Sequence, residues 1–289
     1  MTDQIGHAYV GTSGWKKAHW RGGFYPKGLV QRRELEFASR RFTSLEVNST
    51  FHGLQRPSSF ATWRDETPDG FVFAIKGLEA VTRMARFRNA RGNLSEFFAS
   101  GLLELGDKLG PMLWQLPSGS VFDAASMSGF LDLLPRTFAA ASALAAETDP
   151  AFAEANTSDD RRIRHAIEAR DASYLNSEFT DMLTTAGAAI VFTNTPDSPA
   201  FHEPTADFVY VRLNSGEDHF AEGYDEATLR DWADRIQGLT TGPPARDVFA
   251  YFKNPAGVLP HTPHNAVRLL RMLGQDPEAV GIEILGTNL

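Results

Sequence analysis

Short apolar runs recur along the whole chain, and they are rich in β-branched and aromatic residues. Runs of this length and composition are typical of buried β-strands. The pattern predicts eight strands, at residues 8–15, 44–50, 71–76, 111–116, 165–170, 188–194, 208–214 and 247–254.

Helix signals lie between most of these runs. Asp123 is placed to cap a helix that Pro135 ends. Asn176 is placed to cap a second helix that Gly187 ends. Residues 195–206 contain three prolines and no helical spacing, so a long irregular loop is expected after the sixth strand. Further helices are predicted within residues 33–42, 58–63, 94–109, 139–162, 225–236 and 263–273.

Strands that alternate with helices form βαβ units and a parallel sheet. Right-handed crossovers leave two main arrangements, an open doubly wound sheet or a closed eight-stranded barrel. No shift in composition divides the chain, and eight strands suit the barrel. We therefore predict a single (β/α)8 TIM-type barrel domain over residues 1–289.

Composition narrows the class of protein. The chain has no cysteine, which excludes disulfides, thiolate metal sites and a cysteine nucleophile. Hydrophobic residues make up 42% and charged residues 22%, as in ordinary globular proteins. No apolar run approaches the roughly 18 residues of a membrane helix, and residues 1–10 lack a signal-peptide core, so a cytoplasmic protein is expected.

Charge is distributed unevenly. Residues 1–117 carry 16 Lys and Arg against 11 Asp and Glu, whereas residues 118–289 carry 12 against 25. The basic residues concentrate at 16–41 and 83–91. Such runs are usually solvated surface, although a basic face can also attract phosphates.

Polar residues stand near the carboxyl ends of the predicted strands. Side chains alternate between the two faces of a strand, so a residue's phase decides whether it points into the barrel. In strand eight, the side chains predicted to point into the barrel are those of Ala250, Phe252 and Asn254. The other polar residues at inward or final strand positions are Ser13, Glu46, Asn48, Lys76, Gln115, Glu168, Arg170, Asn194, Arg212 and Asn214.

All strands of a parallel barrel end at one mouth, which is where barrel enzymes place their active sites. Lys76, Arg170 and Arg212 outnumber Glu46 and Glu168 there, so the mouth favours a carboxylate or phosphate group. Either glutamate suits a general acid or base, and Lys76 suits charge stabilisation or attack on a carbonyl. The alternative is that buried Glu–Arg pairs tie the strands together with no ligand.

Eight sequence motifs, taken together, resemble the YecE-like family, domain of unknown function 72. They are GTSGW at 11–15, FYP at 24–26, LEVNSTF at 45–51, FVFAIK at 71–76, LGDKLG at 105–110, QLP at 115–117, AIEAR at 166–170 and YVRL at 210–213. The resemblance runs from about residue 8 to residue 273. It implies a TIM-type barrel but no established reaction. It also implies a shared pocket formed by Glu46, Asn48, Lys76, Gln115, Glu168, Arg170, Arg212 and Asn254.

The chain departs from the family pattern at the mouth. Asp171 and Tyr174 stand where the family has His and Trp, and Asn194 stands where it has Asp. Asn214 and Ser215 replace a His-Gly pair, and His52 replaces a Tyr. The resemblance therefore leaves open a different ligand or the loss of a catalytic step.

Other motifs are weaker. The eight histidines lack the spacing of a metal site, so neither a metal nor a cofactor is predicted. Trp15, Trp20, Phe24 and Tyr25 either form an aromatic wall beside the mouth or pack the first loop, and Trp15 is included among the candidate substrate-binding residues.

Three functions are consistent with these features. The favoured one is a cofactor-independent enzyme, with hydrolase-like acid/base chemistry, acting on a small polar substrate that carries an anionic group. The second is a protein acting on phosphodiesters or nucleic acid through the basic loops 16–41 and 83–91. The third is a non-catalytic protein that binds an anionic ligand. The sequence indicates no membrane partner and no oligomeric state.

Overall fold

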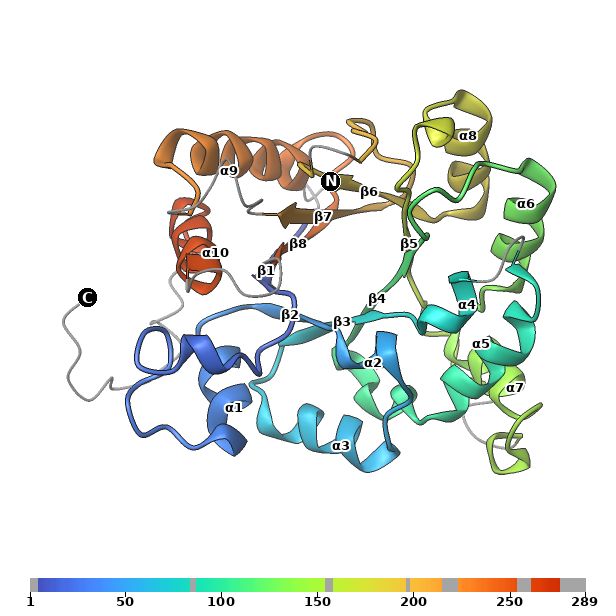
Figure 1. The fold of residues 1–289 in the computed structure, drawn as a ribbon, viewed down its shortest axis with the longest axis horizontal. Helices are drawn as coiled ribbons and strands as arrows, with labels where there is room; N and C mark the ends of the chain where they lie inside the picture. The colour runs from blue at the N-terminus through green and yellow to red at the C-terminus, as the bar shows by residue number, and fades with distance from the viewer. Residues whose placement is uncertain are drawn as a thin grey trace.

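The computed structural model describes residues 5–83, 87–153, 158–195, 198–214, 223–253 and 261–275. All eight predicted strands form, and they lie parallel in one sheet in the order β1-β8-β7-β6-β5-β4-β3-β2 (Figure 1). The strands are β1 (Ala8–Thr12), β2 (Ser44–Val47), β3 (Val72–Lys76), β4 (Leu109–Gln115), β5 (His165–Glu168), β6 (Ala189–Thr193), β7 (Phe208–Asn214) and β8 (Asp247–Lys253).

The sheet curls into a nearly closed barrel. Strands β1 and β2 meet through a bridge between Ser13 and Glu46 and through the Gly14 amide, which donates to the Glu46 carbonyl at 2.8 Å. The predicted TIM-type barrel is therefore confirmed.

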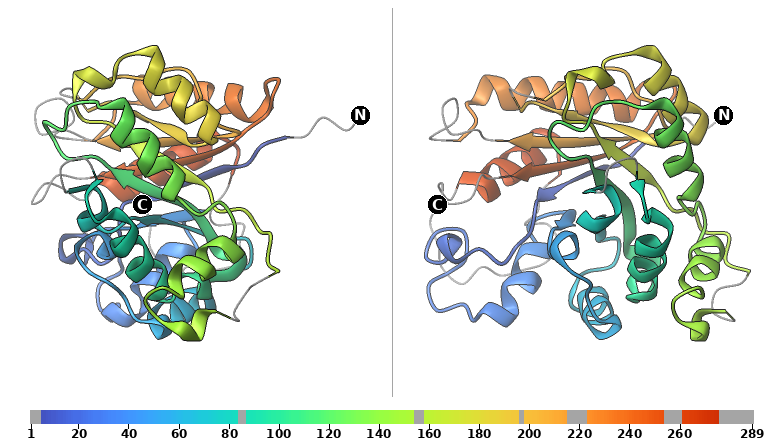
Figure 2. Two further views of the ribbon diagram at one scale, coloured as in Figure 1. Left: turned by 90° about the vertical axis from the view of Figure 1, so that its right-hand side faces the viewer. Right: turned by 45° about the vertical axis from the view of Figure 1, so that its right-hand side comes forward.

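Helices cover the outside of the barrel (Figure 2). The α-helices are α1 (Glu34–Ser39), α2 (Ser49–His52), α3 (Pro57–Glu66), α4 (Glu79–Arg83), α5 (Ala90–Ala99), α6 (Ala124–Leu133), α7 (Phe138–Ala145), α8 (Ser177–Ala186), α9 (Glu226–Thr241) and α10 (His261–Met272). The 3-10 turns are η1 (Ala18–Trp20), η2 (Gln31–Arg33), η4 (Leu102–Lys108), η5 (Pro150–Phe152) and η6 (Ala172–Tyr174). Within the described parts of the chain, no helix is long and apolar enough to cross a membrane.

The predicted helix ends are largely confirmed. Asp123 accepts from the Ser126 amide at the start of α6, and Asn176 accepts from the Phe179 amide at the start of α8. Gly187 ends α8 in the left-handed region, with φ of 63°. The described residues between β6 and β7 contain no helix, as the prolines predicted.

The predicted helix over 94–109 is wrong in its second half. Helix α5 ends at Ala99, a 3-10 turn follows, and Leu109 already begins β4. Gly101 and Gly106 take φ of 93° and 55°, which an α-helix cannot accommodate. The helical spacing of apolar residues therefore continues past the point where the backbone leaves the helical conformation.

The core has two layers. Outward side chains of the strands pack against the helices, and a smaller cluster fills the barrel. This inner cluster consists of Ala74, Leu113, Ala166, Ala189, Val191, Phe208, Tyr210, Phe249 and Tyr251, with Tyr9, Val72 and Ala206 packed against it.

The predicted phase of strand eight is wrong. Phe249 and Tyr251 belong to the inner cluster, whereas Ala250 and Phe252 pack outside. Both faces of β8 are apolar, so alternation alone cannot distinguish inside from outside. Lys253 therefore continues the inward phase, and the predicted site residue Asn254 lies outside the described residues.

We expect Gly11→Ala to destabilise the fold, because a Cβ at this position would lie 1.8 Å from the Ser44 carbonyl oxygen. Forcing β1 away from β2 should lower the free energy of unfolding by about 1–3 kcal/mol, measured by urea denaturation.

Gly129→Ala is the matched control, because Gly129 lies inside α6 with nothing within 4 Å of an added Cβ. It should stabilise the protein by about 0.5–1 kcal/mol. Equal stability of the native protein and Gly11→Ala would contradict a close contact between β1 and β2.

Candidate functional site at the barrel mouth

Five polar residues from different strands meet in one buried cluster at the carboxyl ends of the strands. They are Glu46, Lys76, Gln115, Glu168 and Arg212, and each is nine-tenths or more buried. Each of these side chains points into the barrel from near the end of its strand, so the five meet at the mouth, as the alternation of polar and apolar residues predicted.

Arg212 connects the two carboxylates across the barrel. Its Nη2 donates to Glu46 Oε1 at 2.9 Å, and its Nη1 donates to Glu168 Oε2. Arg212 is 2% exposed, and its Nε is buried without an acceptor in the described structure. Burial opposes the charged form, but the two carboxylates outweigh it and raise the pKa of Arg212, so it stays protonated.

Glu46 is fully engaged in hydrogen bonds. Besides Arg212, Oε1 accepts from the Ser13 hydroxyl at 2.5 Å, and Oε2 accepts from the Tyr210 hydroxyl at 2.8 Å. Burial alone would raise the pKa of Glu46, but Arg212 and these hydroxyls, together with Lys76, outweigh burial and lower it. Glu46 is therefore an ionised anchor for Arg212.

Glu168 is less occupied. Its Oε2 accepts from Gln115 at 2.8 Å and from Arg212, whereas its Oε1 lies 3.9 Å from Arg170 Nε. No described residue donates a hydrogen bond to Oε1. Burial opposes ionisation of Glu168, but Arg212, Gln115, Lys253 and Arg170 outweigh it and lower its pKa. This carboxylate thus combines negative charge with an available oxygen.

Lys76 ends β3 and points into the mouth. Its ammonium lies 3.5 Å from the centre of the Phe51 ring, which α2 places there. The Thr50 hydroxyl of the same short helix donates to the Lys76 carbonyl at 2.7 Å. Burial and Arg212 lower the pKa of Lys76 to about 8, although Glu46 and Glu168 oppose this change.

Lys253 is a site residue that the sequence analysis missed. It follows the inward phase of β8, and electrostatic interactions link it to Glu46, Glu168 and Arg212. Burial and Arg212 lower its pKa. With Lys253, four cations face the two carboxylates, so the positive excess is larger than predicted. If the inward face of β8 had been assigned to Phe249 and Tyr251, Lys253 would have been predicted as a site residue.

Partly exposed polar side chains surround this buried cluster. Asn48 donates to the Ser13 hydroxyl at 2.5 Å, and Arg170 lies beside Glu168. The backbone amide of Asn214 donates to Asn194 Oδ1 at 2.8 Å, while Asn214 Oδ1 has no partner in the described structure. These residues form a rim that joins the buried charges to solvent.

Trp15 does not belong to this cluster. The strand β1 ends at Thr12, and Trp15 packs edge-on against Trp63 and close to Phe73 in the outer core. Trp20, Phe24 and Tyr25 are also buried there, so these aromatic residues pack the first loop rather than form a wall at the mouth.

Asp171 and Tyr174, which also depart from the family pattern, have structural contacts. Asp171 accepts from the Ser173 amide and caps η6. Tyr174 packs against Phe122 and Phe179. These contacts lie outside the buried charges of the mouth.

The described residues contain no cluster of three or more His, Asp and Glu side chains that suits a metal ion. His165 illustrates the structural use of histidine. Its Nδ1 accepts from Trp114 at 3.0 Å, its Nε2 lies 2.7 Å from the Pro135 carbonyl, and burial lowers its pKa to about 4.

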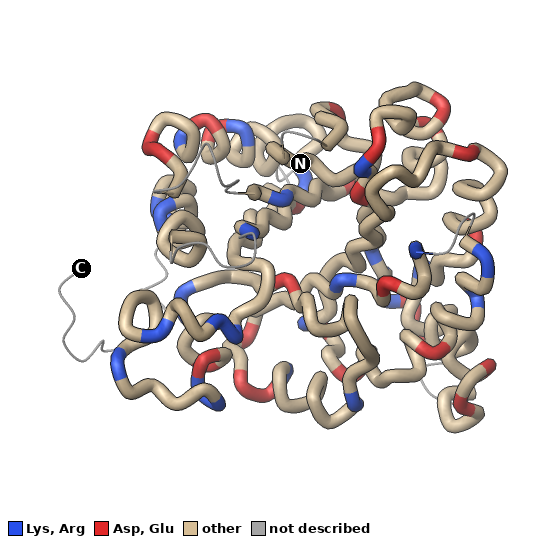
Figure 3. The backbone as a smooth tube through the Cα atoms, viewed as in Figure 1, with Lys and Arg blue, Asp and Glu red and all other residues tan. Residues whose placement is uncertain are grey.

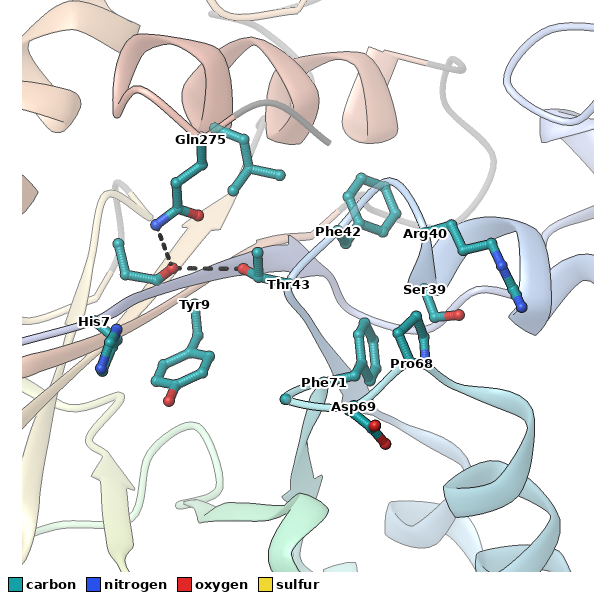
Figure 4. A pocket seen from close by; sticks show the side chains of 13 residues that line it. His7, Tyr9, Ser39, Arg40, Phe42, Thr43, Pro68, Asp69, Phe71 and Gln275 are labelled. Atoms are coloured by element: carbon teal, nitrogen blue, oxygen red, sulfur yellow. Dashed lines mark hydrogen bonds between the residues drawn. The ribbon is translucent and has the colours of Figure 1, made fainter. Parts of the chain in front are cut away.

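A cavity of about 560 Å³ lies at the opposite end of the barrel (Figure 4). Residues at the starts of β1 and β3 line it, including His7, Tyr9, Asp69 and Phe71. Gln275 closes one side and donates to the Ala8 carbonyl at 3.1 Å. The polar cluster of the mouth does not contribute to this cavity.

Comparisons with known proteins identify relatives of the whole fold. A family model described as "Protein of unknown function DUF72" matches residues 9–286. A DUF72 family protein from Thermotoga maritima superposes with a TM-score of 0.69 at 20% identity, covering 93% of this chain and 100% of that one. One from Enterococcus faecalis superposes with a TM-score of 0.65 at 14% identity, covering 94% and 100%.

Curated sequences match over a shorter region. The UPF0759 protein YecE of Escherichia coli is 28% identical over 131 residues, which is 45% of each protein. The UPF0759 protein YunF of Bacillus subtilis is 25% identical over 114 residues, or 38% of this chain and 39% of that protein. The aligned region thus spans less than half the length of these relatives.

We expect Arg212→Met to lower the free energy of unfolding by about 3–5 kcal/mol, because it leaves two buried carboxylates without their shared partner. Arg230→Met is the control, since Arg230 pairs with Glu226 on the exposed surface of α9. Denaturant unfolding should show a large loss for Arg212→Met and almost none for Arg230→Met. Similar losses for both would show that burial of the pair is unimportant.

Stability should also depend on pH through Glu46. Its pKa in the folded protein lies below the ordinary value of 4.5, so its stabilising effect is present above that pH and is lost as the pH falls through the folded value. We expect Glu46→Gln to be less stable than the native protein at pH 7, with a difference that shrinks below about pH 4.5. Unfolding curves from pH 7 to pH 3 measure this difference, and a constant difference would contradict it.

Proposed function

The chain belongs to the DUF72 family, and we propose that it is an enzyme that binds a small polar substrate by an anionic group at the C-terminal mouth of its barrel. One observation carries this proposal. Two buried carboxylates share Arg212, while Lys76, Lys253 and Arg170 add positive charge beside them.

A purely structural role explains this cluster less well. Buried ion pairs are weak stabilisers, because desolvation offsets most of their attraction. Apolar residues of similar size hold strands together at lower cost, as they do elsewhere inside this barrel. The excess of cations at a rim that reaches solvent is instead what recognition of a carboxylate or phosphate requires.

The contacts suggest different roles for the two glutamates. Glu46 holds Arg212 and has no unoccupied oxygen. Glu168 is ionised and has Oε1 available, so we assign it the role of general base. A water molecule activated by Glu168 would make the reaction a hydrolysis.

The remaining polar residues orient the substrate in this proposal. Arg170 and Lys253 attract its anionic group, and Arg170 has the planar donors for bidentate binding. The substrate-orienting residues are Ser13, Asn48, Gln115 and Asn214, which supply hydroxyl and amide groups around the carboxylates.

Nucleic acid is a less favoured ligand. Basic residues follow β1 on the side of the molecule where the strands end (Figures 2 and 3). Arg21 and Arg33 in this segment already pair with Glu34 and Glu36, and Arg91 pairs with Glu147. These partners would compete with phosphates, so the basic loops are weaker candidates than the mouth.

We expect Arg170→Ala to weaken binding of small anions by about 10-fold or more, because a hydrogen bond to a charged group is typically worth about 1.5–3 kcal/mol. A panel of small carboxylates and phosphates, with inorganic phosphate as the simplest member, can be tested by ligand-dependent shifts in melting temperature. Arg162→Ala is the control, because Arg162 pairs with Asp207 on the exposed surface.

Three results would count against the proposal. Equal binding by the native protein and Arg170→Ala would place the anion elsewhere. Tighter binding of oligonucleotides than of small anions, with a steep loss as salt rises, would favour nucleic acid. Binding without turnover of any bound compound, unchanged by Glu168→Gln, would favour a non-catalytic binding protein.

A further inference from the structure

Lys76 has a combination of features that anion binding alone does not require. Its side chain is only 6% exposed, and its ammonium lies against the face of Phe51. No acceptor among the described residues forms a hydrogen bond with its Nζ. A buried lysine that serves only as a structural cation would be expected to have such partners.

The nearby carboxylates do not lock this amine in an ion pair. Glu46 accepts from Ser13, Tyr210 and Arg212. Glu168 accepts from Gln115 and Arg212 on Oε2. The two glutamates therefore attract Lys76 electrostatically without forming a salt bridge to it in the described structure.

Two cations lie close enough to disfavour the ammonium form. Arg212 and Lys253 both act on Lys76, and burial adds to their effect. With a pKa of about 8, a substantial fraction of Lys76 carries a lone pair near neutral pH. Desolvation and a neighbouring cation are the two means by which proteins make lysine a nucleophile.

We propose that Lys76 is the nucleophile for a substrate that carries an aldehyde or ketone as well as a carboxylate or phosphate, and that it forms a Schiff base with that carbonyl. The inference rests on the proposed function, since the anionic group is held by the same mouth. To the proposed function it adds a carbonyl group on the substrate and a covalent bond between that carbonyl carbon and Lys76.

The step balances without a cofactor. The Lys76 lone pair forms a C–N bond to the carbonyl carbon, and the C=O π electrons move to the oxygen. Both amine protons pass in turn to this oxygen, and we assign Glu168, which interacts electrostatically with Lys76, as their carrier. The oxygen leaves as water, and the nitrogen lone pair completes the C=N bond.

Reductive trapping tests the inference on the native protein. Glyoxylate is the probe because it is a small aldehyde with a carboxylate, and sodium borohydride reduces any Schiff base to a stable carboxymethyl amine. Peptide mass spectrometry then locates the modified lysine. Lys16 and Lys27 are exposed internal controls, and Lys253 is a partly buried one.

We expect Lys76 to be modified roughly 10-fold or more faster than Lys16 or Lys27 at pH 7, because it has far more neutral amine than a lysine of ordinary pKa. The rate at Lys76 should reach half its maximum near pH 8. Lys76→Met should lose this modification, while Lys16 and Lys27 of the same variant react as before.

Equal modification of all lysines, or modification of Lys253 in preference to Lys76, would overturn the inference. A second probe separates it from the proposed function. If inorganic phosphate binds in an Arg170-dependent manner but glyoxylate does not modify Lys76, the proposed function stands and the Schiff base fails. If neutral acetaldehyde modifies Lys76 as fast as glyoxylate does, the nucleophile is supported and recognition of an anion fails.

Discussion

A single buried guanidinium organises the mouth of this barrel. Arg212 extends from β7 and donates to carboxylates on β2 and β5, so three strands that are distant in sequence are joined at one point. Each partner depends on the others for its charge. Without Arg212 the two carboxylates would be buried anions, and without them Arg212 would be a buried cation. The register of the strands must therefore keep all three ends together.

This constraint makes the two glutamates unequal. The hydroxyl groups of Ser13 and Tyr210 complete the shell of Glu46, whereas Glu168 keeps one oxygen without a donor among the described residues. Lys76 forms no hydrogen bond to either glutamate among the described residues, although both attract it electrostatically. The cluster around Arg212 thus contains both an available carboxylate oxygen and an amine outside any ion pair of the described structure.

Most of this arrangement could be predicted from the sequence, because β2, β3, β5 and β7 each combine an apolar outward phase with a polar inward residue near the strand end. Alternation failed at β8, where Phe249 and Tyr251 on one face and Ala250 and Phe252 on the other are all apolar. It could not assign Lys253 for that reason. Trp15 is the last residue of the predicted first strand, but β1 ends at Thr12 and the chain turns at Gly14, with φ of 80°, so the strand phase does not continue to Trp15.

The interior of the barrel explains why the charges at the mouth act so strongly on one another. Below them, Tyr9 stacks on Phe249 at 4.7 Å and Phe208 packs edge-on against the same ring, which fills the interior with apolar groups. Tyr210 and Tyr251 lie between these rings and the carboxylates, and the Tyr210 hydroxyl binds Glu46. Solvent therefore reaches the cluster from the rim and not through the interior. Because these charges are buried and therefore poorly screened, Arg212 keeps both glutamates ionised and also disfavours the ammonium of Lys76.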